Sequence, residues 1–142
     1  MLSKGFFLGS VCGCTLVALA ALADENSYDT SKLPPAAAKT GVTYAADIQP
    51  LFERSCYACH GPKTPKPKGK LRLDSLELVM KGGEDGAAVT PGDIAKSPLL
   101  ANIAHLGDQD DFMPPPKSKG KIIPLSKEEI GLVRAWVEQG AK

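Results

Sequence analysis

The sequence has few aromatic residues and almost no net charge, and each shortage narrows what the protein can be. Tyr, Phe and Trp make up only 6% of the 142 residues. A domain with so few large apolar side chains has a marginal core, which a bulky apolar cofactor would help to complete. Lys and Arg number 17 against 16 Asp and Glu. This balance argues against nucleic-acid binding, which normally needs a basic excess.

Residues 1–23 also lack charge, with Lys4 as the single exception. Their apolar stretch ends in the Ala-Leu-Ala pattern of residues 21–23, and polar residues follow at once. This pattern is typical of a secretory signal peptide that is cleaved after Ala23. We therefore expect a periplasmic or otherwise exported protein without a membrane attachment after cleavage. The alternatives are a retained anchor and a lipoprotein, the second because "VCGC" loosely resembles a lipidation site.

Cysteine is scarce as well, because cleavage would remove two of the four and leave Cys56 and Cys59. A disulfide between residues so close in sequence closes a very small loop and stabilises the fold little. His60 follows directly and completes C-x-x-C-H, the motif of c-type haem attachment. The spacing lets both thiols reach the vinyl groups at one porphyrin edge while the histidine binds the iron. We predict one covalent haem c, with Cys56 and Cys59 as thioethers and His60 as an iron ligand.

Two other kinds of site use the same residue types. A structural zinc site needs four ligands, and the fourth would be His105, far outside the usual spacing from His60. A thioredoxin-like dithiol would require a βαβ context, which the sequence does not indicate. Both interpretations explain the exported C-x-x-C-H less well than haem attachment.

Several side chains could occupy the sixth coordination position of the haem iron. Met113 is favoured because it lies in "FMPPP", where prolines restrict the backbone and Phe112 is an apolar neighbour. Met80 follows an apolar run and is typical of core packing. His105 is a second candidate ligand, although it could also lie exposed or near a haem propionate. A vacant sixth position is the remaining alternative.

Local patterns predict short helices separated by long loops, and therefore an all-α fold. The helical signals lie in residues 47–60, 97–107 and 125–140, and residues 71–83 predict a short extended piece followed by a short helix that ends at Gly82 and Gly83. We expect Asp47 and Ser97 to act as N-caps of their helices. The last segment has the strongest signal, because Ser126 and Glu129 form a capping box and Gly140 is placed to end the helix. Residues 24–41 show no period and predict a flexible leader before a domain at residues 42–142.

The motif lies in a longer pattern that resembles the planctomycete-type cytochrome c domains, within the class I c-type cytochromes. The matching segments, in order, are "VTYAADIQPLFERSCYACHGP", "GKLRLDS", "KGGEDG", "VTPGD", "SPLL", "FMPP" and "LSKEEIGLVRAWVEQGA". They run from Val42 to Ala141. The resemblance implies a small cytochrome c fold, with three to five helices and long loops around one covalent haem. It also implies His60 and Met113 as axial ligands of the iron, and electron transfer as the activity.

We therefore predict an exported monohaem cytochrome that carries one electron at a time between redox proteins and is not an enzyme. One alternative is a peroxidase-like haem enzyme or gas sensor with a displaceable sixth ligand. Another is a domain that feeds electrons into a larger oxidoreductase.

Charged residues near the motif suggest two further roles. Arg72 could pair with a haem propionate or, if exposed, with Asp74 or Glu77. A ring of lysines around the haem edge could steer an acidic redox partner. These are the lysines at 63, 66, 68, 70, 117, 119 and 121. The acidic residues at 108, 110 and 111 would weaken that field, which favours a solvated surface instead.

Overall fold

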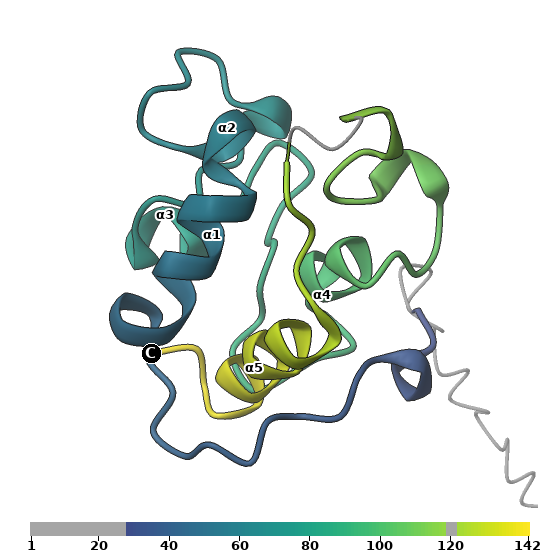
Figure 1. Ribbon diagram of the computed structural model, residues 1–142. Coiled ribbons are helices and arrows are strands. Elements are labelled where there is room, and N and C mark those ends of the chain that lie inside the picture. Colours follow the sequence, from purple (N-terminus) through teal and green to yellow (C-terminus); the bar gives the residue numbers. More distant parts are fainter. Residues whose placement is uncertain (1–27, 119–121) are drawn as a thin grey trace, which may run out of the picture.

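The computed structural model describes residues 28–118 and 122–142. Within these ranges it contains five α-helices and no β-strand, only two isolated bridges (Figure 1). The helices are α1 (Gln49–Ser55), α2 (Tyr57–His60), α3 (Leu76–Lys81), α4 (Pro98–Ile103) and α5 (Lys127–Glu138). The all-α prediction is confirmed at this level. The predicted signal peptide, residues 1–23, lies outside the described residues.

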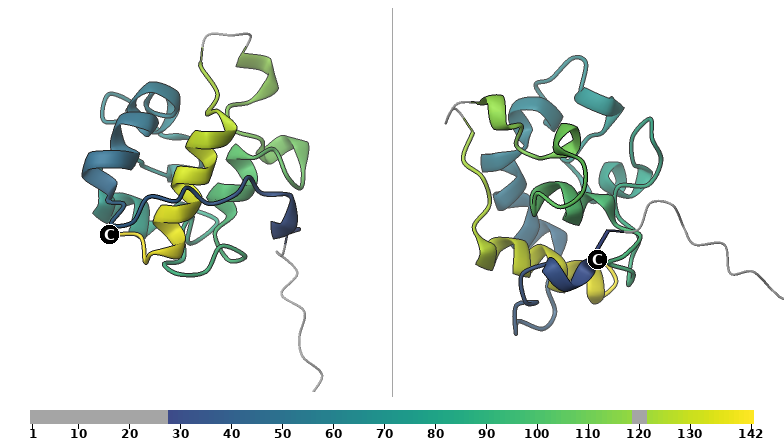
Figure 2. Two further views of the ribbon diagram at one scale, coloured as in Figure 1. Left: turned by 60° about the horizontal axis from the view of Figure 1, so that its bottom comes forward. Right: turned by 90° about the vertical axis from the view of Figure 1, so that its right-hand side faces the viewer.

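The helices stand around a central core (Figures 1 and 2). In the view of Figure 1, α1, α2 and α3 lie on the left, α4 lies on the right and α5 lies below. The residues just before α5 run down between the two sides as an extended segment. None of the helices in the described ranges has the length and apolar character needed to cross a membrane.

The core is formed where α1, α4 and α5 meet. Phe52 from α1, Leu100 from α4 and Trp136 from α5 are fully buried. Tyr44, just before α1, lies between two of these aromatic rings, with centroid distances of 6.1 Å to Trp136 and 6.3 Å to Phe52. Three of these four large side chains are aromatic, a kind of residue that the chain contains only rarely. Val133 adds to the same core from α5.

Helix α5 begins and ends as the sequence predicts. The Ser126 hydroxyl accepts a hydrogen bond from the Glu129 backbone N–H at 3.2 Å. In return, the Ser126 backbone N–H donates to the Glu129 carboxylate at 2.8 Å, which completes the capping box. Gly140 follows the helix with φ of +95°, a conformation that glycine adopts without a steric penalty.

The start of the first helical region differs from the prediction. Tyr44–Ile48 form a π-helical turn before α1, and its N-cap is Thr43 rather than Asp47. The Asp47 carboxylate instead lies inside the turn and accepts a hydrogen bond from the Thr43 backbone N–H at 3.0 Å. The helix also does not run unbroken through the motif, because Cys56 has φ of −126° and ψ of −30° and separates α1 from α2.

Part of the segment predicted as a flexible leader, residues 24–41, packs on the domain from Tyr28 onward. Residues 28–41, here called the N-terminal arm, have little regular structure but pack along α5 (Figure 2). Leu33 in the arm is buried, and the Ala37 backbone N–H donates to the Gly131 carbonyl at 2.9 Å. Arg134 of α5 donates to the Pro34 carbonyl at 3.1 Å. The arm therefore belongs to the folded unit.

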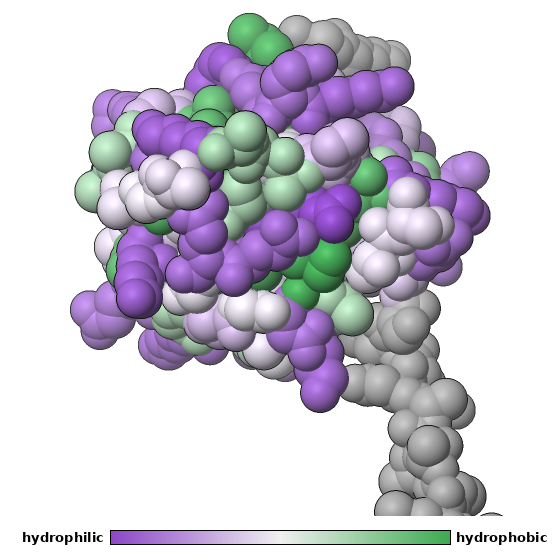
Figure 3. Space-filling model, turned by 90° about the horizontal axis from the view of Figure 1, so that it is seen from below, coloured by the Kyte–Doolittle hydropathy of each residue, from purple (hydrophilic) through white to green (hydrophobic). Residues whose placement is uncertain are grey.

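The face crossed by the arm is mixed in character. Seen from below, hydrophilic side chains cover most of it, with smaller apolar patches between them (Figure 3). A cleft of about 440 Å³ lies between the arm and the start of α5, lined by Pro34, Pro35, Ala37, Lys127 and Glu128. The arm thus covers part of α5 while leaving a shallow, partly apolar surface beside it.

Candidate functional site

The three residues of the C-x-x-C-H motif lie within one helical turn. Cys56 is the junction residue between α1 and α2, and Cys59 and His60 are the last two residues of α2. The Cys56 carbonyl accepts hydrogen bonds from the backbone N–H groups of Cys59 at 3.0 Å and His60 at 2.9 Å. Both thiols are free and partly exposed. The turn therefore presents two thiols and one imidazole together.

The imidazole of His60 is buried and held in one orientation. Its Nδ1 lies 3.0 Å from the carbonyl oxygen of Leu71. Because a carbonyl can only accept, Nδ1 carries the proton, and Nε2 of the neutral ring is left with a free lone pair. The Leu73 N–H donates to the His60 carbonyl at 2.9 Å, so residues 71–73 hold both the backbone and the ring. A hydrogen bond of this kind, from the ring nitrogen that does not bind the metal, is common for metal-binding histidines.

The thiol of Cys56 does not have the properties of a redox nucleophile. Although Cys56 keeps some exposure, desolvation by burial raises the pKa of its thiol to about 12, and the neighbouring Cys59 adds to the shift. Dithiol oxidoreductases depend on a lowered thiol pKa. The thioredoxin-like alternative is therefore not supported.

The zinc alternative finds no support in the described residues either. Among them, no group of three or more His, Cys, Asp and Glu side chains is arranged to hold a metal ion. His105, which would have been the fourth ligand, instead follows α4 and contacts the loop that contains Met113. The site is therefore not a closed set of protein ligands around a single metal ion.

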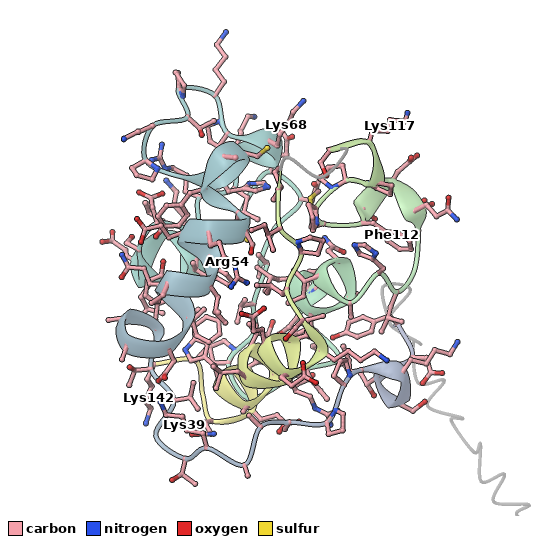
Figure 4. All side chains as sticks on the ribbon, in the orientation of Figure 1. Lys39, Arg54, Lys68, Phe112, Lys117 and Lys142 are labelled. Carbon is pink, nitrogen blue, oxygen red and sulfur yellow. The ribbon has the colours of Figure 1, made fainter. Side chains whose placement is uncertain are left out.

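Met113 lies in a loop that is tied to the end of α4. Its side chain is partly buried and packs against the core. Its backbone N–H donates to the Asn102 carbonyl at 2.9 Å, and its own carbonyl oxygen lies 3.2 Å from Nε2 of His105. Figure 4 shows the preceding residue, Phe112, on this loop beside α4. Met80, the other candidate methionine, is also partly buried, at the end of α3.

The motif and the Met113 loop lie on opposite sides of the upper part of the molecule. α2 is on one side, and residues 108–118 are on the other (Figures 1 and 2). Lys68 and Lys117 mark the two sides at the upper end (Figure 4). A cleft of about 300 Å³ on the Met113 loop is lined by Gln109, Asp110, Pro115, Pro116 and Lys117, but not by any residue of the motif. The donor groups, rather than a cavity, define the candidate site.

These donor groups fit a c-type haem. Two free thiols adjoin an imidazole whose Nε2 is available, and a partly buried thioether is available from another segment. This is the set of groups that holds haem in His/Met cytochromes c. The buried hydroxyl of Tyr57, inside the motif, has no hydrogen-bond partner among the described atoms. Such a group would be satisfied by a polar atom of a ligand or by a water molecule.

Two of the charged residues near the motif, Arg72 and Lys70, form ion pairs. Arg72 forms an ion pair with Asp74 at 2.9 Å and lowers the pKa of that carboxyl group, which is one of the two predicted alternatives for Arg72. Pairing with a propionate stays a prediction. Among the predicted ring of lysines, Lys70 forms an exposed ion pair with Glu84 at 3.4 Å. The lysines at 119 and 121 lie outside the described residues.

Sequence reasoning missed the groups that position the candidate ligands. Leu71 and Asn102 act through backbone carbonyls, which carry no signal in the side-chain pattern. The contact of His105 with Met113 could have been suspected only from their proximity in sequence. The structure thus adds the positioning groups to a ligand set that the sequence had indicated.

The C-x-x-C-H turn, the oriented histidine and the helical fold are together typical of c-type cytochrome domains. The family model of planctomycete cytochrome C matches residues 56–117, a range that begins at the first motif cysteine and includes Met113. This match supports the planctomycete-type cytochrome c domain that the sequence predicted, and the family indicates covalently bound haem c and haem-based electron transfer. Searches of the curated proteins and of the solved structures find no match.

Proposed function

We propose that the protein is an exported monohaem cytochrome that carries one electron at a time, with His60 and Met113 as the axial ligands. The observation that carries this proposal is the orientation of His60, whose Nδ1 is committed to Leu71 and whose Nε2 is therefore available to iron. Cys56 and Cys59 would hold the haem covalently beside it.

A bound haem would supply a reversible Fe(III)/Fe(II) couple, and the residues of the chain set its properties. The hydrogen bond from His60 to Leu71 fixes the ring and raises its basicity as a ligand. The neutral thioether of Met113 would stabilise reduced iron relative to a harder ligand, which would raise the reduction potential. Thioethers at Cys56 and Cys59 would hold the haem to the chain.

The surroundings of Met113 favour a carrier over an enzyme or gas sensor. A haem enzyme or gas sensor needs a displaceable sixth ligand and a polar side chain that is free to act beside it. The sequence has two histidines, and the one outside the motif is His105. Its ring is stacked on Phe112, and its Nε2 contacts the Met113 carbonyl. It is therefore not free to act as a distal acid or base.

The partner is proposed to be another redox protein, docked near the upper end of the molecule. Lys68, on the side of the motif, and Lys117, on the side of the Met113 loop, both lie at this end (Figure 4). Positive charge there would speed association with an acidic partner at low ionic strength. Export follows from the predicted signal peptide, and feeding electrons into a larger oxidoreductase would use the same surface.

The test uses two methionines as matched positions. Haem-loaded wild-type protein, Met113→Leu and Met80→Leu are compared, since the same volume-conserving change is made at both sites. The oxidised wild type should show the weak near-infrared band of methionine-to-iron charge transfer, and the reduced form should bind carbon monoxide slowly. Met113→Leu should lose the band and bind carbon monoxide rapidly, whereas Met80→Leu should behave as wild type.

Two results would contradict the proposal. If Met80→Leu loses the band and Met113→Leu keeps it, the ligand assignment is wrong. If the wild type already binds carbon monoxide rapidly, the sixth position is open and the enzyme or sensor alternative replaces the carrier.

A further inference from the structure

His105 lies immediately beyond α4 in an uncommon backbone conformation. Its φ is +55°, in the left-handed region that residues other than glycine rarely adopt. This conformation is accompanied by two contacts of the ring. The imidazole stacks on Phe112, with a centroid distance of 4.7 Å and an interplanar angle of 3°. Its Nε2 lies 3.2 Å from the Met113 carbonyl oxygen, so Nε2 carries the proton that is donated.

The end of α4 therefore holds Met113 at both polar groups of its backbone. The Met113 N–H donates to the Asn102 carbonyl at 2.9 Å, and the Met113 carbonyl accepts from His105. Asn102 belongs to α4, where the neighbouring Leu100 and Ile103 are buried in the core. Through these two hydrogen bonds, the position of Met113 is coupled to a helix that is packed into the core.

We propose that His105 is a positioning residue that holds Met113 where its thioether can reach the haem iron. The inference rests on the proposed function, because it assumes that Met113 is the sixth ligand. His105 acts through the Met113 carbonyl and the Phe112 ring and does not touch the iron. Phe112 in turn keeps the segment before the ligand fixed against the same imidazole.

The exposure of His105 separates this role from ordinary core packing. The side chain is exposed, so its removal takes little apolar surface out of the core. Its two ring contacts are both with the Met113 loop. Loss of His105 should therefore release the ligand more than it unfolds the domain.

The size of the effect follows from the two contacts that are lost. A net hydrogen bond and a stacked ring pair together favour the ligand-bound arrangement by about tenfold or more. If methionine must leave before carbon monoxide can bind, the population of the ligand-free form limits binding. The carbon monoxide association rate of the reduced protein should therefore rise about tenfold when the ring is removed.

The experiment uses haem-loaded protein with His105→Asn, His105→Gln and Phe112→Leu. Asparagine adopts positive φ readily but is too short to reproduce the ring contacts, so it removes them with little backbone strain. Glutamine keeps an N–H donor without the stacking, and Phe112→Leu keeps the donor but removes the stacked ring. Three quantities are measured: the carbon monoxide rate, the temperature at which the near-infrared band disappears, and the urea midpoint of global unfolding.

We expect His105→Asn to raise the carbon monoxide rate about tenfold and to lose the band at a lower temperature, with a nearly unchanged urea midpoint. His105→Gln and Phe112→Leu each keep a donor but lose the stacking, so both should fall between the wild type and His105→Asn. A wild-type rate in His105→Asn would overturn the inference. So would a rate that rises only in proportion to a falling urea midpoint, since that would show a general structural role.

Met113→Leu distinguishes failure of the inference from failure of the proposed function. If Met113→Leu opens the iron while His105→Asn leaves the rate unchanged, only the inference is wrong. If Met113→Leu leaves carbon monoxide binding slow and His105→Asn makes it rapid, His105 is itself the ligand, and both proposals are wrong.

Discussion

Gly131, in the middle of α5, lies directly beneath the N-terminal arm. A Cβ atom added at this position would lie 2.4 Å from the carbonyl oxygen of Pro35, well inside the closest approach of real Cβ atoms. The obstructing atom belongs to the backbone, so a rotamer change cannot relieve the contact. Gly131→Ala should therefore push the arm away from α5.

Two effects of opposite sign compete in this variant. Alanine in a helix interior is favoured over glycine by about 1 kcal/mol. Against this, displacement of the arm weakens the hydrogen bond from Ala37 to the Gly131 carbonyl and the one from Arg134 to Pro34, at about 1 kcal/mol each. Partial exposure of Leu33 costs about 1 to 2 kcal/mol more. The clash should win, with a net destabilisation of about 2 kcal/mol.

The assay combines urea unfolding of the haem-loaded protein with brief trypsin digestion. Gly131→Ala should lower the unfolding free energy and expose the arm to cleavage at Lys32 and Lys39. Arg134→Ala is the control that removes one arm contact without a clash, and it should cause a smaller loss. If Gly131→Ala instead stabilises the protein by about 1 kcal/mol, helix propensity alone decides the outcome and the arm does not pack on α5 as described.

Two further predictions concern the rest of the fold. The ion pair with Arg54 at 2.9 Å lowers the pKa of the Glu129 carboxyl group. A pKa that is lower in the folded state stabilises the protein at pH values above the ordinary carboxyl pKa. This stabilisation should be lost as the pH falls through the pKa of the folded state. Arg54→Met should reduce the difference in unfolding free energy between neutral and acidic pH by about 0.5 to 1 kcal/mol. An unchanged pH profile would show that the ion pair contributes nothing. Ser97 is fully buried, and its hydroxyl donates to the Asp93 carbonyl at 2.7 Å and accepts from the Thr90 N–H at 2.9 Å. Ser97→Ala should cost about 1 to 3 kcal/mol of unfolding free energy, whereas Ser97→Thr should cost less if the hydroxyl is what matters.

The elements that sequence predicted correctly are those whose signals are local. The capping box of Ser126 and Glu129 needs only residues three apart, and the start of α4 at Pro98 needs only the fixed φ of proline. The C-x-x-C-H motif is likewise contained in five consecutive residues. Even here the detail differed at Ser97, whose hydroxyl bonds to the preceding loop and makes no capping hydrogen bond to α4.

The features that sequence did not predict depend on contacts between distant segments. The arm is ordered because Gly131, far along the chain, leaves room for Pro35, and nothing in residues 28–41 indicates this. The orientation of His60 depends on a backbone carbonyl at Leu71. The role of His105 depends on the left-handed turn after α4, which returns its ring to Phe112. Each of these contacts is specified by the fold and not by a local pattern.

The intact mass of the protein after export is the most direct test of the central claim, that Cys56 and Cys59 hold one haem covalently. We predict a mass greater than that of the chain from Asp24 to Lys142 by one haem, with the colour retained by the chain after treatment with acidified organic solvent. Cys59→Ala should leave at most one thioether and a low yield of haem-loaded protein. A chain of unmodified mass, or a haem that the solvent extracts, would contradict the account.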